Sequence, residues 1–312
     1  MMNKSLLVAC CSLFVFALFA CHSPKPDPYK DDTTTSGHVL VLADEDLRNI
    51  VDAEKLVFES IYTNAQLDIR YMPEAQLLKA MMNDSVRCVI ATVKPGADQE
   101  AFFAKRRITA HVVPICTDGI AVVMNKSRNG NVISTDQLRL VLDTKNEEPL
   151  WSLFEPMQYL TLEKVVPIFT SPGSGIGRVL IDSLALGGLR GSARASVDEL
   201  INDIAANAGH IGFVPFAAIS DLDNPHMRAL RDRVMLLSIG SDTSLAVLPS
   251  QSTLADGQYP LRREVYMILA EGKSGLGTGF VSFVANHKGQ RILLKLGVAP
   301  HKVPAREVEI VH

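Results

Sequence analysis

The chain has 312 residues, of which 47% are apolar and 21% charged, and its formal net charge is −3. These proportions are typical of a globular protein, and the length suits two hydrophobic cores better than one. The slight negative charge and the lack of a basic stretch argue against a nucleic-acid partner.

The first twenty residues have the pattern of an export signal. Lys4 precedes an apolar run at positions 6–20. This run is shorter than the roughly 20 apolar residues that a permanent transmembrane helix needs. Residues 1–20 are therefore predicted to direct export and to be removed afterwards.

Cys21 follows this segment, with Ala20 directly before it and Leu18 three positions before it. The pattern resembles the lipobox of bacterial lipoproteins, in which the cysteine is acylated, with palmitate among the chains, and becomes the new N-terminus. Several acyl chains on one residue give stable anchoring. The alternative is an ordinary signal peptide that leaves Cys21 as a free thiol. We expect a chain in the cell envelope, bound through Cys21 to membrane lipid on the periplasmic face or the cell surface.

Residues 21–36 are predicted to form a disordered tether. The segment contains three prolines and a run of three threonines, without apolar periodicity. Such a composition cannot bury enough surface to order itself, and its prolines keep it extended. A disordered spacer is predicted between the lipid and the folded part.

The folded part begins with alternating short strands and helices. Strands are predicted at residues 38–42, 67–71 and 88–93, and helices at 47–62 and 74–82, from the spacing of their apolar residues. This βαβαβ order is typical of a parallel sheet covered by helices.

A second series of similar size follows without a low-complexity linker. Its predicted strands are residues 120–125, 165–169, 211–215, 235–239 and 263–270, and its helices are one capped by Ser134, then 176–186, 197–206 and a closing helix at 279–296. Two α/β series suggest two lobes that share the chain more than once.

Three cysteines remain after processing, Cys21, Cys88 and Cys116. The last two lie in strand-like runs and read as buried thiols that behave as small hydrophobic groups. The compartment permits a disulfide, but spacing alone does not fix connectivity, so pairing of Cys88 with Cys116 stays open.

Four segments carry a family resemblance. They are residues 117–125 with 134–139, residues 171–175, residues 209–215, and residues 259–263 with 277–290. In their order and spacing they resemble the phosphate-binding protein family of ATP-driven phosphate importers, over roughly residues 115–298. The resemblance implies a two-lobed periplasmic-binding-protein type II fold with an interlobe cleft and hinge crossovers. Lobe I would comprise residues 37–115 and 261–312, and lobe II residues 116–260.

The resemblance also implies a small oxyanion, phosphate first, as ligand and an ABC permease as partner. Backbone N–H groups at a helix N-terminus suit an oxyanion, because free donors and the helix dipole both favour negative charge. Ser174, Gly175 and Ile176 are the expected helix start, although Ser174 could equally be a plain N-cap. The other implied ligand residues are Asp44, Glu45, Thr92 and Arg178.

Several positions depart from the family pattern. The family arginine, aspartate and threonine of the anion loop are replaced by Thr170, Pro172 and Ile176. Arg178, four residues after Ser174, is a candidate to replace the arginine but could equally be a solvated surface residue, and Lys94 is another candidate. The strand ending at Thr92 lacks the family acid that accepts a proton from phosphate.

The loop at residues 44–46 is acidic where the family usually has hydroxyl side chains. Acids there would repel an anion unless they point away or are protonated. Alternatively they cap the helix that begins near Leu47, since negative charge is favoured at a helix N-terminus.

Enzymatic patterns are missing. Ser174 lacks the preceding glycine of a nucleophile elbow, and no phosphate-binding Gly-Lys-Ser/Thr follows the glycines. The eight histidines show no useful metal spacing. We therefore predict no catalytic centre, cofactor or metal. Two functions remain: oxyanion capture for an importer, or a relative that has lost its ligand and acts as a sensor or scaffold.

Overall fold

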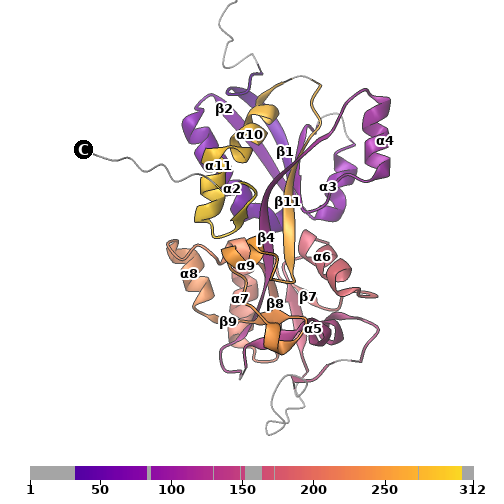
Figure 1. The fold of residues 1–312 in the computed structure, drawn as a ribbon, viewed down its shortest axis with the longest axis vertical. Coiled ribbons are helices and arrows are strands. Elements are labelled where there is room, and N and C mark those ends of the chain that lie inside the picture. The colour runs from indigo at the N-terminus through magenta and orange to yellow at the C-terminus, as the bar shows by residue number, and fades with distance from the viewer. Residues whose placement is uncertain are drawn as a thin grey trace, which may run out of the picture.

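The computed structural model describes residues 32–303, apart from 83–85, 129, 148, 152–163, 172 and 273. The predicted signal segment and Cys21 lie outside these residues. Two lobes lie one above the other, and strands β4 (His111–Asn125) and β11 (Arg262–Leu269) run lengthwise between them (Figure 1). In the part of the chain that the structure describes, no helix is long and apolar enough to span a bilayer. The two-lobed α/β fold predicted from the sequence is confirmed.

Lobe I is built on a sheet in the order β2-β1-β3-β11-β4. Strands β1 (Gly37–Asp44), β2 (Ala65–Met72) and β3 (Cys88–Ala91) are parallel, whereas β11 is antiparallel to β3 and β4. The elements around this sheet are the 3-10 turn η1 (Glu45–Leu47) and the helices α2 (Arg48–Ile61), α3 (Glu74–Ala80), α4 (Ala97–Lys105), α10 (Leu276–Ala285) and α11 (His287–Lys295). The short strand β12 (Ala299–Pro300) pairs with β4.

Lobe II continues the same sheet beyond β4 with β8 (His210–Pro215), β6 (Val166–Phe169) and β7 (Ser192–Ala193), while β9 (Val234–Leu236) pairs with the end of β4. Strands β5 (Val132–Ser134) and β10 (Ser238–Gly240) form a separate parallel pair. The remaining elements are helices α5 (Thr135–Leu142), α6 (Gly175–Leu184), α7 (Val197–Ala206), α8 (Pro225–Arg231) and α9 (Gln251–Ala255), and the turns η3 (Phe216–Ala218) and η4 (Thr243–Leu245). Ser134 caps α5 as predicted, since its Oγ accepts from the Gln137 N–H at 3.1 Å.

Strand β4 belongs to both lobes. Its first half pairs with β11 up to Gly119, and from Ile120 it pairs with β8. The predicted lobe boundary at 115/116 falls inside this strand, and the one at 260/261 falls just before β11. Strand β4 and the chain that enters β11 therefore connect the two lobes.

Two predicted elements are each divided in the structure. The closing helix at 279–296 is two helices, because the backbone of Asn286 is extended, with φ −94° and ψ 174°, and ends α10 before α11 begins. The strand at 235–239 is β9 followed by β10, and the two pair with different partners. Local periodicity did not reveal either break.

The last residues of the predicted tether are ordered. Thr33 pairs with Ser36 in a β-bridge, and the Asp32 carboxylate accepts from the Leu276 N–H at 2.7 Å, at the start of α10. The expectation of disorder up to residue 36 therefore does not hold from Asp32 onward. A carboxylate at a helix N-terminus is favourable, which explains why this polar segment packs on lobe I.

Cys88 and Cys116 are buried free thiols. They lie on β3 and β4, which are separated by β11, so the open question of pairing is answered in favour of two reduced side chains. Burial raises the pKa of both thiols, so neither is a reactive thiolate.

Candidate functional site

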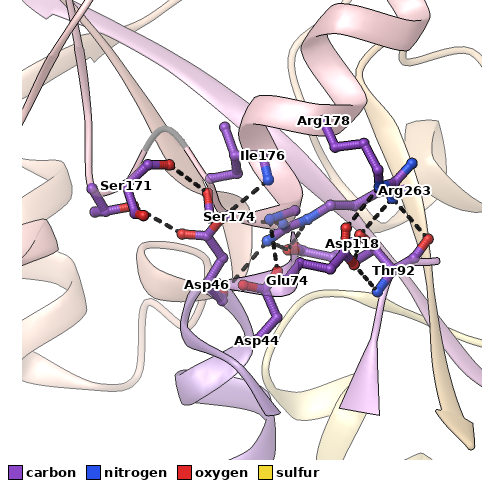
Figure 2. A network of polar contacts seen from close by, with 12 residues as sticks. Asp44, Asp46, Glu74, Thr92, Asp118, Ser171, Ser174, Ile176, Arg178 and Arg263 are labelled. Atoms are coloured by element: carbon purple, nitrogen blue, oxygen red, sulfur yellow. Dashed lines mark hydrogen bonds and ion pairs between the residues drawn. The ribbon is translucent and has the colours of Figure 1, made fainter. Parts of the chain in front are cut away.

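The lobes meet at the N-terminus of α6, a lobe II helix that faces the carboxyl end of β1 in lobe I (Figure 2). The Gly175 N–H donates to Asp44 Oδ2 at 2.9 Å, and the Ile176 N–H donates to Asp46 Oδ2 at 3.1 Å. The Thr170 hydroxyl donates to Asp46 Oδ1 at 2.8 Å. The donors that could hold an oxyanion therefore hold two carboxylates of the opposite lobe.

Arg263 on β11 lies against this contact and is 3% exposed. Its Nε and Nη2 donate to Asp118 Oδ2, at 3.2 and 2.9 Å. Its Nη1 lies 3.7 Å from Asp46 Oδ2 but forms no hydrogen bond within the described residues. A buried guanidinium with one free edge thus points toward the start of α6, which makes it a natural anion-binding group.

A third interlobe contact joins α6 to α3 and β3. Arg178 Nε donates to Glu74 Oε2 at 2.7 Å, and its Nη2 donates to the carbonyl oxygen and hydroxyl of Thr92 at 3.0 and 2.9 Å. The Thr92 N–H and hydroxyl both donate to Glu74 Oε1. Arg178 is therefore not a solvated surface residue. It bridges the lobes.

The cluster contains four buried acids, Asp44, Asp46, Glu74 and Asp118, and two arginines. Burial, and next the charge of Asp46, raise the pKa of Asp44, while Arg263 opposes the rise. Burial also raises the pKa of Asp118, against the effect of Arg263. Crowding four acids against two arginines therefore disfavours the ionised form of Asp44 and Asp118.

The structure brings together most of the residues singled out from the sequence. Asp44 accepts from the Gly175 N–H, the Ile176 N–H donates to the neighbouring Asp46, and Thr92 and Arg178 lie beside them. The Ser174 side chain turns away, because its hydroxyl donates to the Ser171 carbonyl at 2.8 Å. Lys94 lies over the ring of Tyr266, 4.8 Å from its centroid, and takes no part in the cluster.

The alternative role of residues 44–46 holds for their position only, since Asp44 is the N-cap residue of η1 and Glu45 and Asp46 lie in its first turn. Asp44 precedes η1 without any side-chain capping bond, because its carboxylate reaches across to α6. Glu45 points elsewhere and lines a cavity of about 230 Å³ between the lobes. A second cavity, of about 310 Å³, is lined on the other side by Glu74, Ser174 and Arg178.

Sequence reasoning missed Glu74, Asp118 and Arg263. Asp118 lies in the mostly apolar strand β4 and Arg263 among the charged first residues of β11, and the two face each other in the β4–β11 register. A charged residue at a buried strand position was the available signal. Among the described residues, no group of three or more His, Cys, Asp or Glu side chains is arranged to hold a metal ion.

Comparison with known proteins places this arrangement in a family. A family model described as the PBP superfamily domain matches residues 30–288. Protein SphX of Synechococcus elongatus is 25% identical over 213 residues, which are 65% of this chain and 58% of that protein. The chain thus matches less than two thirds of the length of this curated relative.

Two solved structures show the same fold. An ABC-type phosphate transport receptor from Vibrio cholerae superposes with a TM-score of 0.65 at 10% identity, covering 85% of this chain and 100% of that one. PstS from Borrelia burgdorferi gives a TM-score of 0.55 at 15% identity, covering 86% and 100%. The chain therefore belongs to the PBP superfamily of periplasmic-binding-protein-like domains, with the fold of the phosphate-binding proteins of ABC transporters.

Proposed function

We propose that this chain is a solute-binding lipoprotein that takes a small oxyanion, phosphate first, between its lobes for an ABC importer. The observation that carries the proposal is that the Gly175 and Ile176 N–H groups already hold carboxyl oxygens, at 2.9 and 3.1 Å. The carboxylates of Asp44 and Asp46 stand in for the oxygens of an anion.

Side chains around the helix start support the same ligand class. The Thr170 hydroxyl occupies the position where the family has arginine, and it donates to an anionic oxygen. Arg263 supplies a guanidinium from the hinge strand instead, with its Nη1 directed at the α6 N-terminus. Helix N–H groups, a hydroxyl and a guanidinium form a donor set suited to an oxyanion.

Calorimetric titration of the mature chain with phosphate, sulfate and a phosphonate tests this proposal, with Cys21→Ser to keep the chain unlipidated. We expect one phosphate per chain, and roughly tenfold weaker binding by Thr170→Val, because one hydrogen bond to a charged oxygen is lost. The matched control is Thr243→Val, an exposed threonine on η4, which should bind as the parent does. No binding of any anion at millimolar concentration would sink the proposal.

A second candidate function rests on the same contacts. Because Asp44 and Asp46 already satisfy the α6 donors, the chain can close without a solute and so act as an envelope sensor or scaffold. This candidate predicts a compact chain that binds none of the tested anions.

The membrane anchor is part of the proposal. Acylation at Cys21 would keep the lobes at the membrane, where a permease could receive the solute. Metabolic labelling with palmitate checks this point: label should be lost in Cys21→Ala and retained in Cys11→Ala, whose cysteine lies in the segment predicted to be removed. Equal labelling of both variants would contradict the anchor.

A further inference from the structure

We propose that Asp44 and Asp46 act as an internal ligand that closes the lobes in the absence of solute, so that an oxyanion binds only by displacing them. The competition with an oxyanion rests on the proposed function, whereas closure without solute does not. The contacts responsible join residues 130 or more positions apart in the chain and come from different lobes.

The donors cannot serve two acceptors at once. Each backbone N–H at the start of α6 makes one good hydrogen bond, and both are used by the two carboxylates. The Thr170 hydroxyl is also used, and Arg263 Nη1 faces Asp46. Every group that would hold a solute anion is thus already directed at an internal one.

The space directly at Gly175 is filled in this closed form, and the cavity of about 230 Å³ lies beside it, against Asp46 and Thr170. A Cβ atom added to Gly175 would lie 2.4 Å from Asp44 Oδ2 and 2.7 Å from Thr92 Oγ1. An anion therefore cannot approach the Gly175 N–H while the Asp44 carboxyl group stays in place. The two aspartates must therefore move away before the solute arrives, and bending at β4 and β11 provides such a movement.

The surrounding charges favour exchange over joint occupancy. The groups that face the two aspartates are Arg263 on β11, Asp118 on β4, Glu74 on α3 and Arg178 on α6. Adding an anion to this set would place it with four acids against two arginines, where burial already raises the pKa of Asp44 and Asp118. Replacing the aspartates by the anion keeps the balance closer to neutral, which makes the two occupants mutually exclusive.

When an internal ligand occupies the site, only the open chains can bind solute. The apparent affinity for solute is then the intrinsic affinity multiplied by the fraction of chains that are open. Removing both carboxylates should therefore open the unliganded chain and strengthen phosphate binding. Arg178 also bridges the lobes through Glu74, so the expected result is a shift in population toward the open form rather than complete opening.

The distance between the lobes tests the inference. Spin labels at Leu56→Cys in lobe I and Leu245→Cys in lobe II use positions that are 72% and 67% exposed. In Tris buffer without oxyanions or carboxylates, we expect one short distance in the parent and a broader, longer distribution in Asp44→Ala/Asp46→Ala. Phosphate should restore the short distance in that variant. The phosphate concentration needed should be at least tenfold lower than the concentration that saturates phosphate binding to the parent in calorimetry. Asp98→Ala, an exposed acid on α4, is the matched control and should behave as the parent.

Each outcome has one meaning. A parent that is open without anions, or a double variant that stays closed, overturns the internal ligand whatever phosphate does. Distances that change as expected while phosphate, sulfate and phosphonate bind neither protein leave the internal ligand standing and refute the oxyanion function. If the alanine variant fails to fold, Asp44→Asn/Asp46→Asn keeps the side-chain shape without the charge and should lengthen the distance in the same direction.

Discussion

Two buried acids ten positions apart in lobe I differ sharply in their surroundings. Asp44 accepts a hydrogen bond from the Gly175 N–H and lies near Arg263. Glu54, on the buried face of α2, is 1% exposed, and neither of its oxygens has a hydrogen-bond partner within the described residues. Burial raises the pKa of both, but for Glu54 burial acts alone and raises the pKa to about 9.

This difference separates two consequences of burying a carboxyl group. An acid that meets donors of the opposite lobe joins the lobes and depends on their relative position. An acid without a partner opposes folding whenever it is ionised, and it is kept neutral instead. Asp44 is therefore a candidate for controlling how the two lobes close on each other, whereas Glu54 lowers the stability of lobe I.

The largest effect is expected from removing the charged partner of a buried acid. Arg263→Met would leave Asp118 buried without its guanidinium and with only backbone donors such as the Ala217 N–H, a step toward the situation of Glu54. Breaking a buried ion pair on one side costs about 3–5 kcal/mol. We expect a loss of this size in the free energy of unfolding, measured by urea denaturation.

Two further variants make this result specific. Arg262→Met changes the exposed neighbour on the same strand and should alter the stability by no more than about 0.5 kcal/mol. Arg263→Met combined with Asp118→Leu removes both charges and should be more stable than Arg263→Met alone. Equal losses in Arg262→Met and Arg263→Met would mean that the charge pair contributes nothing.

The sequence was sufficient for most of the elements but not for the contacts between lobes. Helix α7 was predicted with its observed bounds, because its apolar residues have helical spacing and Ser196 caps it through its hydroxyl. Helices α10 and α11 were merged, since the extended backbone at Asn286 leaves no mark in the apolar pattern. Local physics thus identifies an element better than it identifies a break within one.

The partners in the site could not be found in the same way. Asp44 and Gly175 are both in loops that the sequence marked, yet nothing local shows that a carboxylate from one lobe fills the helix start of the other. Arg263 and Asp118 become a pair only when β11 is known to lie beside β4 in a particular register. Glu54 follows Ile50 and Val51 at helical spacing, so its burial could be predicted from the sequence. That its carboxyl group has no hydrogen-bond partner within the described residues could not be predicted.

An intermediate effect is expected at the unpartnered acid. Because the pKa of Glu54 rises from 4.5 to about 9 on folding, its contribution to stability is fully present below about pH 4.5 and is lost as the pH rises toward 9. Glu54→Met should stabilise the protein by roughly 1–3 kcal/mol at pH 7, because it removes the desolvation of a polar group without leaving a cavity. Chemical denaturation at pH 5, 7 and 9 measures both effects.

The control for this variant is Glu100→Gln, at an exposed acid on α4. It should keep the parent's dependence of stability on pH, whereas Glu54→Met should flatten it. A Glu54→Met protein that loses stability with pH as steeply as the parent would show that Glu54 has a partner in solution.

The smallest effect is expected where a buried polar group is neutral and already satisfied. Ser174 is 1% exposed, and its hydroxyl donates to the Ser171 carbonyl within the same loop, not toward Asp44 or Asp46. Ser174→Ala should therefore cost about 1 kcal/mol of stability, the net value of one hydrogen bond, and change phosphate binding by less than twofold, in contrast to Thr170→Val. A loss of affinity as large as that of Thr170→Val would mean that Ser174 turns toward the solute when the lobes open. In that case the hydroxyl, like the two aspartates, would change partners between the empty and the occupied site.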